Sequence, residues 1–292
     1  MWDCDCKIYF LKIGNIAIKY SHNFFLFIVV IISMAGCATI NGGYHAADNI
    51  ALRNLFKKEY IKTDLCTLTT FCKITSPGKP ITIYIEGDGA AWLSRHELSD
   101  DPTPRNLLVL SLAVVDSSEN VAYVARPGQL TVFGKPDCNP AYWSERRFSK
   151  EVINAMNSAI NNLKNKSQSK EINIIGYSGG AAIAVIIAAQ RNDIASLRTI
   201  AGNLDSEAVN RYHNVSILQG SMNPIDFAGK ISHIPQRHFV GSKDKVVPQF
   251  IAQSFVKQEG DKNYDRITIV SNATHAKGWC KHWKDLLFLS TL

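Results

Sequence analysis

The stretch that decides the fold is Ile174-Ile175-Gly176-Tyr177-Ser178-Gly179-Gly180. It ends an apolar run from Ile172 and opens an Ala- and Ile-rich run over 179–190. The first run predicts a short buried strand, and the second predicts a helix that is buried nearly all round. A serine between glycines on such a strand-to-helix turn is typical of a nucleophile elbow, where small neighbours leave the hydroxyl accessible. The alternative is a glycine-rich turn that only lets the helix pack on the strand.

Strand-like and helix-like segments alternate on both sides of Ser178. This alternation predicts an α/β fold, in which helices flank a mostly parallel central sheet within one domain over 61–292. The segment 204–234 is less regular and is a candidate lid. Strands are expected over 65–75, 81–85, 121–125, 172–175, 197–200, 238–240 and 267–270, and helices over 105–115, 149–164, 179–190, 248–257 and near Trp283.

A serine hydroxyl needs a base and a group that orients the base. His275 lies in a short loop after the last expected strand, and Asp244 follows the strand that ends at Val240. Such loops, at the carboxyl ends of strands, are where α/β sheets gather ligand-binding groups. We therefore predict Ser178, Asp244 and His275 as a catalytic triad, with Asp205 as the competitor for the acid. The alternative for Asp205 is a helix cap.

The expected strand 81–85 ends in the glycine-rich turn Glu86-Gly87-Asp88-Gly89. We predict that the backbone N–H groups of Asp88 and Gly179 bind the oxyanion. A carboxylate beside an oxyanion would oppose it, so the Asp88 side chain should point away or pair with a cation. Arg95, Arg105 and Arg126 are the candidate partners, and a plain Gly-Asp-Gly turn is the alternative.

From Ile81 to His275 these motifs together resemble the α/β-hydrolase superfamily. More narrowly, the chain resembles a group of bacterial α/β-hydrolase lipoproteins, a resemblance that implies the fold and the triad but brings no substrate. The narrower resemblance is carried by the turn from Glu86 to Trp92, Arg126-Pro127, Tyr142-Trp143 and Ala201-Gly202-Asn203-Leu204-Asp205.

The expected reaction is the hydrolysis of a carboxylic ester or related acyl compound through an acyl-enzyme on Ser178. It needs no metal or organic cofactor. Its substrate would be a small-molecule or lipid-like acyl compound. A thioesterase or peptidase with the same triad stays open, and so does an envelope binding protein or scaffold without turnover.

The N-terminal sequence has the pattern of an export signal. Lysines precede an apolar run over 24–32, which is too short to span a bilayer, and Met34-Ala35-Gly36-Cys37 resembles a bacterial lipobox. We predict a lipoprotein signal peptide over 1–36, lipidation of Cys37 and a tether over 37–60. The protein would then be anchored to the cell envelope, on the periplasmic side of the outer membrane in a Gram-negative host. A plain signal peptide with a coincidental cysteine is the alternative.

Four cysteines follow Cys37, at positions 66, 72, 138 and 280. Export would expose them to an oxidising compartment, so one or two disulfides are expected, with three connectivities open.

The chain carries a net charge of +7, but its Lys and Arg residues are dispersed, so we expect no nucleic-acid partner. No CxxC or HExxH motif occurs, and a zinc site therefore has little support.

Overall fold

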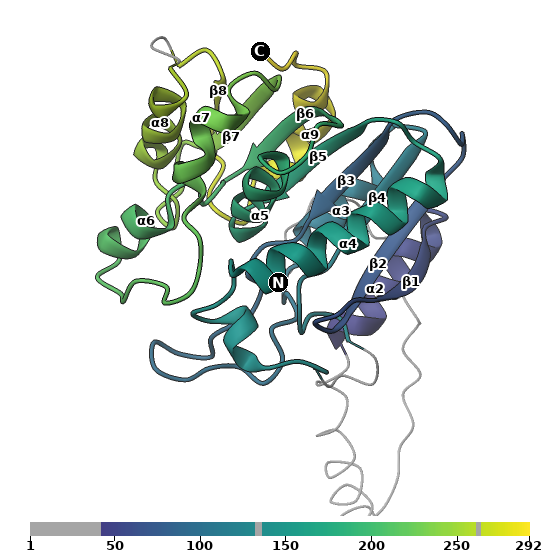
Figure 1. The fold of residues 1–292 in the computed structure, drawn as a ribbon, viewed down its shortest axis with the longest axis horizontal. Helices are drawn as coiled ribbons and strands as arrows, with labels where there is room; N and C mark the ends of the chain where they lie inside the picture. The colour runs from purple at the N-terminus through teal and green to yellow at the C-terminus, as the bar shows by residue number, and fades with distance from the viewer. Residues whose placement is uncertain (1–41, 132–135, 261–263) are drawn as a thin grey trace, which may run out of the picture.

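The computed structural model describes residues 42–131, 136–260 and 264–292 (Figure 1). Their strands form one eight-stranded sheet in the order β1-β2-β4-β3-β5-β6-β7-β8. β1 and β2 are antiparallel to their neighbours, and all later pairs are parallel. The strands are β1 (Lys57–Lys62), β2 (Thr67–Ile74), β3 (Ile81–Ile85), β4 (Asn120–Val124), β5 (Ile172–Tyr177), β6 (Ile194–Ile200), β7 (Gln236–Gly241) and β8 (Ile267–Val270).

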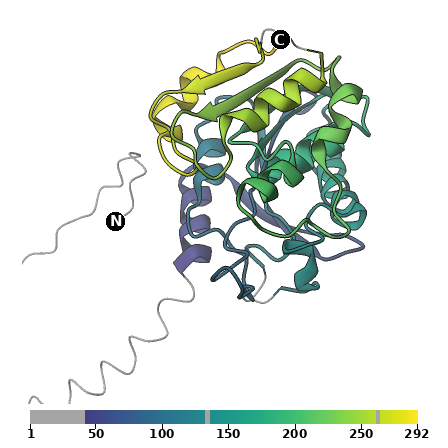
Figure 2. The ribbon, with the colours of Figure 1, turned by 90° about the vertical axis from the view of Figure 1, so that its left-hand side faces the viewer.

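Helices cover both faces of this sheet (Figure 2). Side chains alternate between the faces along each strand, so that Ile83 packs with α4 and α5 while Tyr84 packs with α3 and α9. The two faces thereby build two apolar clusters. One face carries α4 (Lys150–Ser167), α5 (Gly179–Ala188), α7 (Ala228–Ile231) and α8 (Gln249–Gln258), and the other carries α2 (Gly42–Arg53), α3 (Leu108–Val114) and α9 (Trp279–Leu287).

The described part of the expected tether over 37–60 contains a helix and part of a strand. Residues 42–53 form α2, whose Ala47 and Ala51 are buried against the domain, and residues 57–60 belong to β1. Small apolar residues four apart let the helix approach the sheet closely, and this favours packing over a free linker. Ordered structure thus begins before the predicted domain boundary at residue 61.

The predicted signal peptide 1–36 and lipidation site Cys37 lie outside the described residues. Within the described ranges, no helix combines the length and apolarity needed to cross a bilayer.

The segment 204–234 contains more regular structure than its sequence predicts. It holds α6 (Ser206–Tyr212), the 3₁₀ turn η4 (Pro224–Phe227) and α7. Each of these elements is too short to produce a recognisable hydrophobic period in the sequence. These elements lie between β6 and β7.

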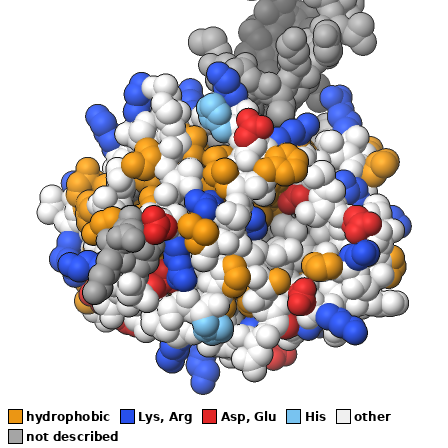
Figure 3. Space-filling model, turned by 90° about the horizontal axis from the view of Figure 1, so that it is seen from above, with side chains coloured by type: hydrophobic (Ala, Val, Ile, Leu, Met, Phe, Trp, Pro, Cys, Tyr) orange, Lys and Arg blue, Asp and Glu red, His pale blue; other side chains and the backbone are white. Residues whose placement is uncertain are grey.

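Charge is distributed evenly on the face seen in Figure 3. Lysine and arginine side chains there are spread among acidic and apolar ones instead of forming a single basic patch.

Candidate active site

Ser178 lies on a strained turn between β5 and α5. Its φ of 50° and ψ of −120° are rare for a residue with a side chain. Two glycines make this turn possible. A Cβ on Gly176 would lie 2.5 Å from the Cα of Ala181, and one on Gly180 would lie 2.4 Å from the carbonyl oxygen of Ile85. The close approach of α5 to the sheet holds the Ser178 hydroxyl at the carboxyl edge of the strands.

The structure brings Ser178, His275 and Asp244 into one hydrogen-bonded chain. Nε2 of His275 lies 3.0 Å from Oγ of Ser178, and Nδ1 of His275 lies 2.9 Å from Oδ2 of Asp244. The Asp244 side chain is fully buried, and the His275 side chain is 18% exposed. This arrangement lets a carboxylate hold one ring nitrogen while the other receives a proton from the serine.

The loops after β7 and β8 position the acid and the base. Oδ1 of Asp244 accepts hydrogen bonds from the backbone N–H groups of Val246 and Val247 at 2.8 and 2.9 Å. This leaves Oδ2 for the imidazole. The Tyr177 hydroxyl donates to the carbonyl oxygen of His275 at 3.1 Å, and this contact ties the histidine loop to the elbow.

Asp205, the competing acid, has a different role. It is the N-cap of α6, and its Oδ1 accepts from the N–H of Ala208 at 3.0 Å and from Nδ2 of Asn223 at 3.0 Å. These contacts are those of a helix cap.

The turn after β3 lies directly against the elbow. A Cβ on Gly87 would be 3.3 Å from Cβ of Ser178, and a Cβ on Gly179 would be 2.0 Å from Oδ1 of Asp88. The two residues predicted to supply oxyanion donors are therefore neighbours beside Ser178.

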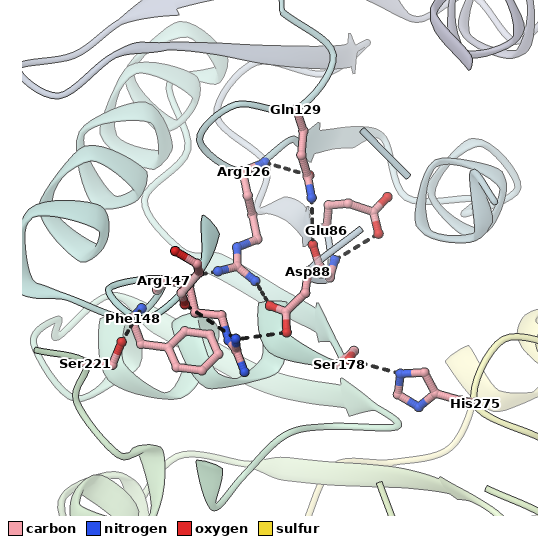
Figure 4. A network of polar contacts seen from close by, with 11 residues as sticks. Glu86, Asp88, Arg126, Gln129, Arg147, Phe148, Ser178, Ser221 and His275 are labelled. Carbon is pink, nitrogen blue, oxygen red and sulfur yellow. Dashed lines mark hydrogen bonds and ion pairs between the residues drawn. The ribbon is translucent and has the colours of Figure 1, made fainter. Parts of the chain in front are cut away.

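The Asp88 carboxylate is held by two guanidinium groups (Figure 4). Arg126 forms an ion pair with Oδ1, and Nε of Arg147 lies 3.4 Å from Oδ2. Burial alone would raise the pKa of Asp88, but the charges of Arg147 and Arg126 outweigh it and lower the pKa. The local charge is therefore net positive, which suits a developing oxyanion.

Of the three arginines considered as partners of Asp88, Arg126 is the one that pairs with it. Arg95 instead donates to the carbonyl oxygen of His213 at 3.1 Å. Arg147 was not foreseen, because its place in the sequence, between η3 (Pro140–Trp143) and α4, gives no sign of where the chain folds back.

Glu86 does not face the reacting atoms. Its buried carboxyl accepts hydrogen bonds from the N–H of Gly87 at 2.8 Å and from the hydroxyl of Tyr123 at 2.9 Å. Burial raises the pKa of Glu86 to about 7, although both hydrogen bonds and the charge of Arg126 work in the opposite direction.

Gln129 is a second residue that sequence reasoning missed. It is buried, its Nε2 donates to the carbonyl oxygen of Gly87 at 2.9 Å, and its Oε1 accepts from the N–H of Arg126 at 3.0 Å. A lone glutamine in a loop carries no motif that could have predicted this bridge.

The segment 204–234 is hydrogen-bonded to the loop that carries Arg147. Oγ of Ser221 accepts from the N–H of Phe148 at 3.1 Å, and the N–H of Met222 donates to the carbonyl oxygen of Phe148 at 3.1 Å. Both guanidinium groups that bind Asp88 also lie over the Phe148 ring, at 5.3 Å for Arg126 and 5.4 Å for Arg147.

In the described ranges, one cluster of potential ligand atoms lies close enough together to hold a metal ion, and it is formed by Cys66, Asp137 and Cys138. None of these residues belongs to the hydrogen-bonded chain at Ser178.

Comparison with solved structures finds the same architecture in hydrolases. A puromycin-hydrolyzing peptidase from Mycobacterium tuberculosis is 14% identical, with a TM-score of 0.57 over 80% of this chain and 39% of the peptidase. Est1E from Butyrivibrio proteoclasticus is 15% identical, with a TM-score of 0.53 over 79% of this chain and 97% of its own. An alpha-beta serine hydrolase homologue from Coxiella burnetii is 16% identical, with a TM-score of 0.53 over 79% of this chain and 93% of its own.

The chain thus spans about two fifths of the peptidase and over nine tenths of the other two. No protein-family model and no curated protein matches the sequence.

Proposed function

We propose that this chain, which has the α/β-hydrolase fold, is a serine hydrolase that cleaves carboxylic esters or related acyl compounds. The fold predicted from the sequence is confirmed by the sheet order and by the solved structures that share it. The observation that carries the proposal is the chain from Ser178 through His275 to Asp244, with contacts of 3.0 and 2.9 Å.

In the proposed first half-reaction, His275 takes the Ser178 proton at Nε2 as Oγ attacks the acyl carbonyl carbon. The carbonyl oxygen becomes an oxyanion, which the backbone N–H groups of Asp88 and Gly179 bind. His275 then gives the proton to the leaving oxygen, and the acyl group stays on Ser178. Asp244 holds the ring so that Nδ1 keeps its proton throughout.

In the second half-reaction, water replaces the leaving group. His275 removes a proton from the water, the resulting hydroxide attacks the acyl carbon, and the Ser178 oxygen leaves with the proton returned by His275. Each step uses groups of the chain and water. Removing Ser178 or His275 should abolish most of the rate, because triad residues act as a unit.

Exposed apolar side chains near the loop of Asp244 support an apolar acyl group as the part of the substrate that this protein binds. Exposed apolar side chains occur on three segments that contact one another through Arg95, His213 and Val246. Nε2 of His213 lies 2.7 Å from the carbonyl oxygen of Val246, two residues beyond Asp244. The exposed apolar residues of segment 204–234 and of the two segments it contacts are Trp92, Leu93, Tyr212, Val215, Ile217, Val246 and Phe250.

A panel of p-nitrophenyl esters with graded acyl chains tests the proposal. We expect hydrolysis by the wild type and none above background by Ser178→Ala. Acyl-thioester and peptide p-nitroanilide substrates in the same assay separate the alternatives, because the same triad serves all three carbonyl types. A preference for the thioester or the anilide over every ester would contradict the esterase proposal and support a thioesterase or a peptidase instead.

We also propose that the protein is exported and anchored at Cys37. The support is the sequence pattern of residues 1–37 alone. Metabolic labelling with a fatty-acid probe should tag the wild type, which should also become smaller when the signal peptide over 1–36 is removed. Cys37→Ser should lose both the label and this decrease in size. Persistence of both in Cys37→Ser would disprove the anchor.

A further inference from the structure

Two cysteines far apart in the sequence meet beside the amino end of β2. Cys66 is buried directly before Thr67, and Cys138 is half-buried on the connection between β4 and η3. Their sulfur atoms and a carboxylate oxygen of Asp137 all lie within 4.8 Å of one another. Oδ2 of Asp137 also accepts from the backbone N–H of Thr67 at 2.9 Å, which holds this connection against β2.

The other pairings of the four described cysteines are blocked by the sheet. Cys72 lies on β2, six residues beyond Cys66, which directly precedes that strand, so the two are roughly 20 Å apart at about 3.3 Å per residue. Cys280 packs in the apolar cluster on the opposite face of the sheet. Among the four described cysteines, the fold therefore leaves the pair Cys66 and Cys138 within bonding reach.

We propose that Cys66 and Cys138 form an intramolecular disulfide that fastens the connection after β4 to the start of β2. The inference rests on the placement of the two sulfur atoms and holds whether or not the proposed hydrolase activity is correct. Disulfides form when the sulfurs approach with little backbone movement, and a separation below 4.8 Å makes this possible.

The bond would form by exchange with a low-molecular-weight disulfide. The Cys138 thiolate attacks the oxidant, forms a mixed disulfide and releases one thiol. Cys66 then loses its proton to solvent and attacks Sγ of Cys138, which releases the second thiol. Two protein thiols are oxidised, and one small disulfide is reduced to two thiols.

The order of attack follows from the surroundings of each thiol. Cys66 is buried and Cys138 is half-buried, so an oxidant in solution reaches the Cys138 sulfur first.

The proposed bond would brace the scaffold of the site. The chain between β4 and α4 carries Cys138 together with Arg126 and Arg147, the two arginines that contact Asp88. Nε1 of Trp143 donates to the carbonyl oxygen of Ser99 at 2.9 Å, so the same connection is fixed at its far end.

Peptide mapping tests the assignment directly. The purified chain is equilibrated with oxidised and reduced glutathione, alkylated and digested without reduction. We expect a linked peptide pair containing Cys66 and Cys138, with Cys72 and Cys280 alkylated. Alkylation of both Cys66 and Cys138 under oxidising conditions would overturn the proposal. So would stoichiometric Zn²⁺ binding that Asp137→Asn abolishes and that leaves both thiols resistant to oxidation.

Thermal unfolding gives a second readout. Oxidised wild type should melt roughly 5–10 °C above the reduced protein, since a long loop is closed. The variant Cys72→Ser/Cys280→Ser should keep this difference, and Cys138→Ser should lose it. Because Cys138 is only half-buried, its serine variant is the one expected to fold; Cys66→Ser repeats the test at the buried position. An equal difference in Cys138→Ser and wild type would contradict the bond.

Discussion

Gln129 donates a hydrogen bond from Nε2 to the carbonyl oxygen of Gly87 at 2.9 Å. The carbonyl of Gly87 and the N–H of Asp88 belong to one planar trans peptide and point in opposite directions. Fixing the carbonyl therefore also fixes the direction of the N–H that we propose as an oxyanion donor. The backbone N–H of Arg126 holds the other end of the Gln129 amide at 3.0 Å, so this side chain cannot turn without breaking a second bond.

Replacing Gln129 by Met should therefore lower kcat by about 10- to 100-fold with little change in KM, because a misdirected donor weakens transition-state binding selectively. Steady-state kinetics on a p-nitrophenyl ester measure this split. Gln258→Met, on the exposed surface of α8, is the matched control and should behave as wild type. A rise in KM alone would contradict the positioning role.

The ion pair between Asp88 and Arg126 should contribute to both stability and rate. Arg126→Met would leave the Asp88 charge beside the oxyanion with only Arg147 at 3.4 Å. We expect a loss of roughly 1–3 kcal/mol in stability, because the Asp88 carboxylate, which is 29% exposed, loses its nearest counter-charge, and a kcat lower by about 100-fold.

Asp88→Asn should be mild on its own, because the proposed donor is its backbone N–H. In the double variant Asp88→Asn/Arg126→Met, kcat should recover to within about tenfold of wild type, so the two changes are strongly non-additive. Kinetics and urea unfolding of all four proteins measure the coupling. Additive effects would show that the arginine acts independently of Asp88.

The close packing of α5 on β3 makes a third prediction. Gly180→Ala would place a methyl group 2.4 Å from the carbonyl oxygens of Ile85 and Glu86. Alanine usually stabilises a helix relative to glycine, but here overpacking should cost about 2–3 kcal/mol and displace Ser178. Gly229→Ala in α7 is the control, since its new Cβ would meet no atom within 4 Å other than those of its chain neighbours and its own helix backbone. Urea unfolding should separate the two, and equal stabilities would argue against the tight elbow.

Glu86 makes the fold sensitive to pH. Its pKa of about 7 in the folded state exceeds the ordinary 4.5, so the folded state binds the extra proton between these values. The free energy of unfolding therefore falls as pH rises from about 4.5 to 7, by roughly 3 kcal/mol from this group.

Glu86→Gln removes this titration while keeping polar atoms for Gly87 and Tyr123. We expect Glu86→Gln to gain more stability over wild type at pH 8 than at pH 5. Urea unfolding at both values checks this. The same offset at both pH values would mean that the carboxyl titrates normally.

The sequence predicted the central strands and the nucleophile turn because their signals are local. The strand expected over 81–85 is β3, and the helix expected over 149–164 is α4, which Ser149 caps, since apolar runs and caps depend on nearest neighbours. The proximity of Ser178, Asp244 and His275 followed from one further rule, that the carboxyl ends of parallel strands meet at one edge.

Predictions failed where long-range packing decides. The packing of the helix at residues 42–53 is not predicted by the sequence, because weak amphipathicity in a short segment does not reveal that the domain has a matching surface. Arg147 and Gln129 reach the turn at Asp88 from loops whose path depends on the whole fold. A residue that acts by orienting a backbone group, as Gln129 does with Gly87, leaves no motif in the sequence.

If Ser178 is an activated nucleophile, it reacts covalently with a probe that modifies activated serines. A fluorophosphonate probe is incubated with the wild type and with Ser178→Ala, His275→Ala and heat-denatured controls, and the modified residue is located by tandem mass spectrometry. We expect stoichiometric labelling of the wild type on the peptide that contains Ser178, strong loss of labelling in His275→Ala and no labelling in Ser178→Ala. A folded wild-type protein that stays unlabelled beside a reactive control hydrolase, or that is labelled elsewhere, would contradict the role of Ser178 as the nucleophile.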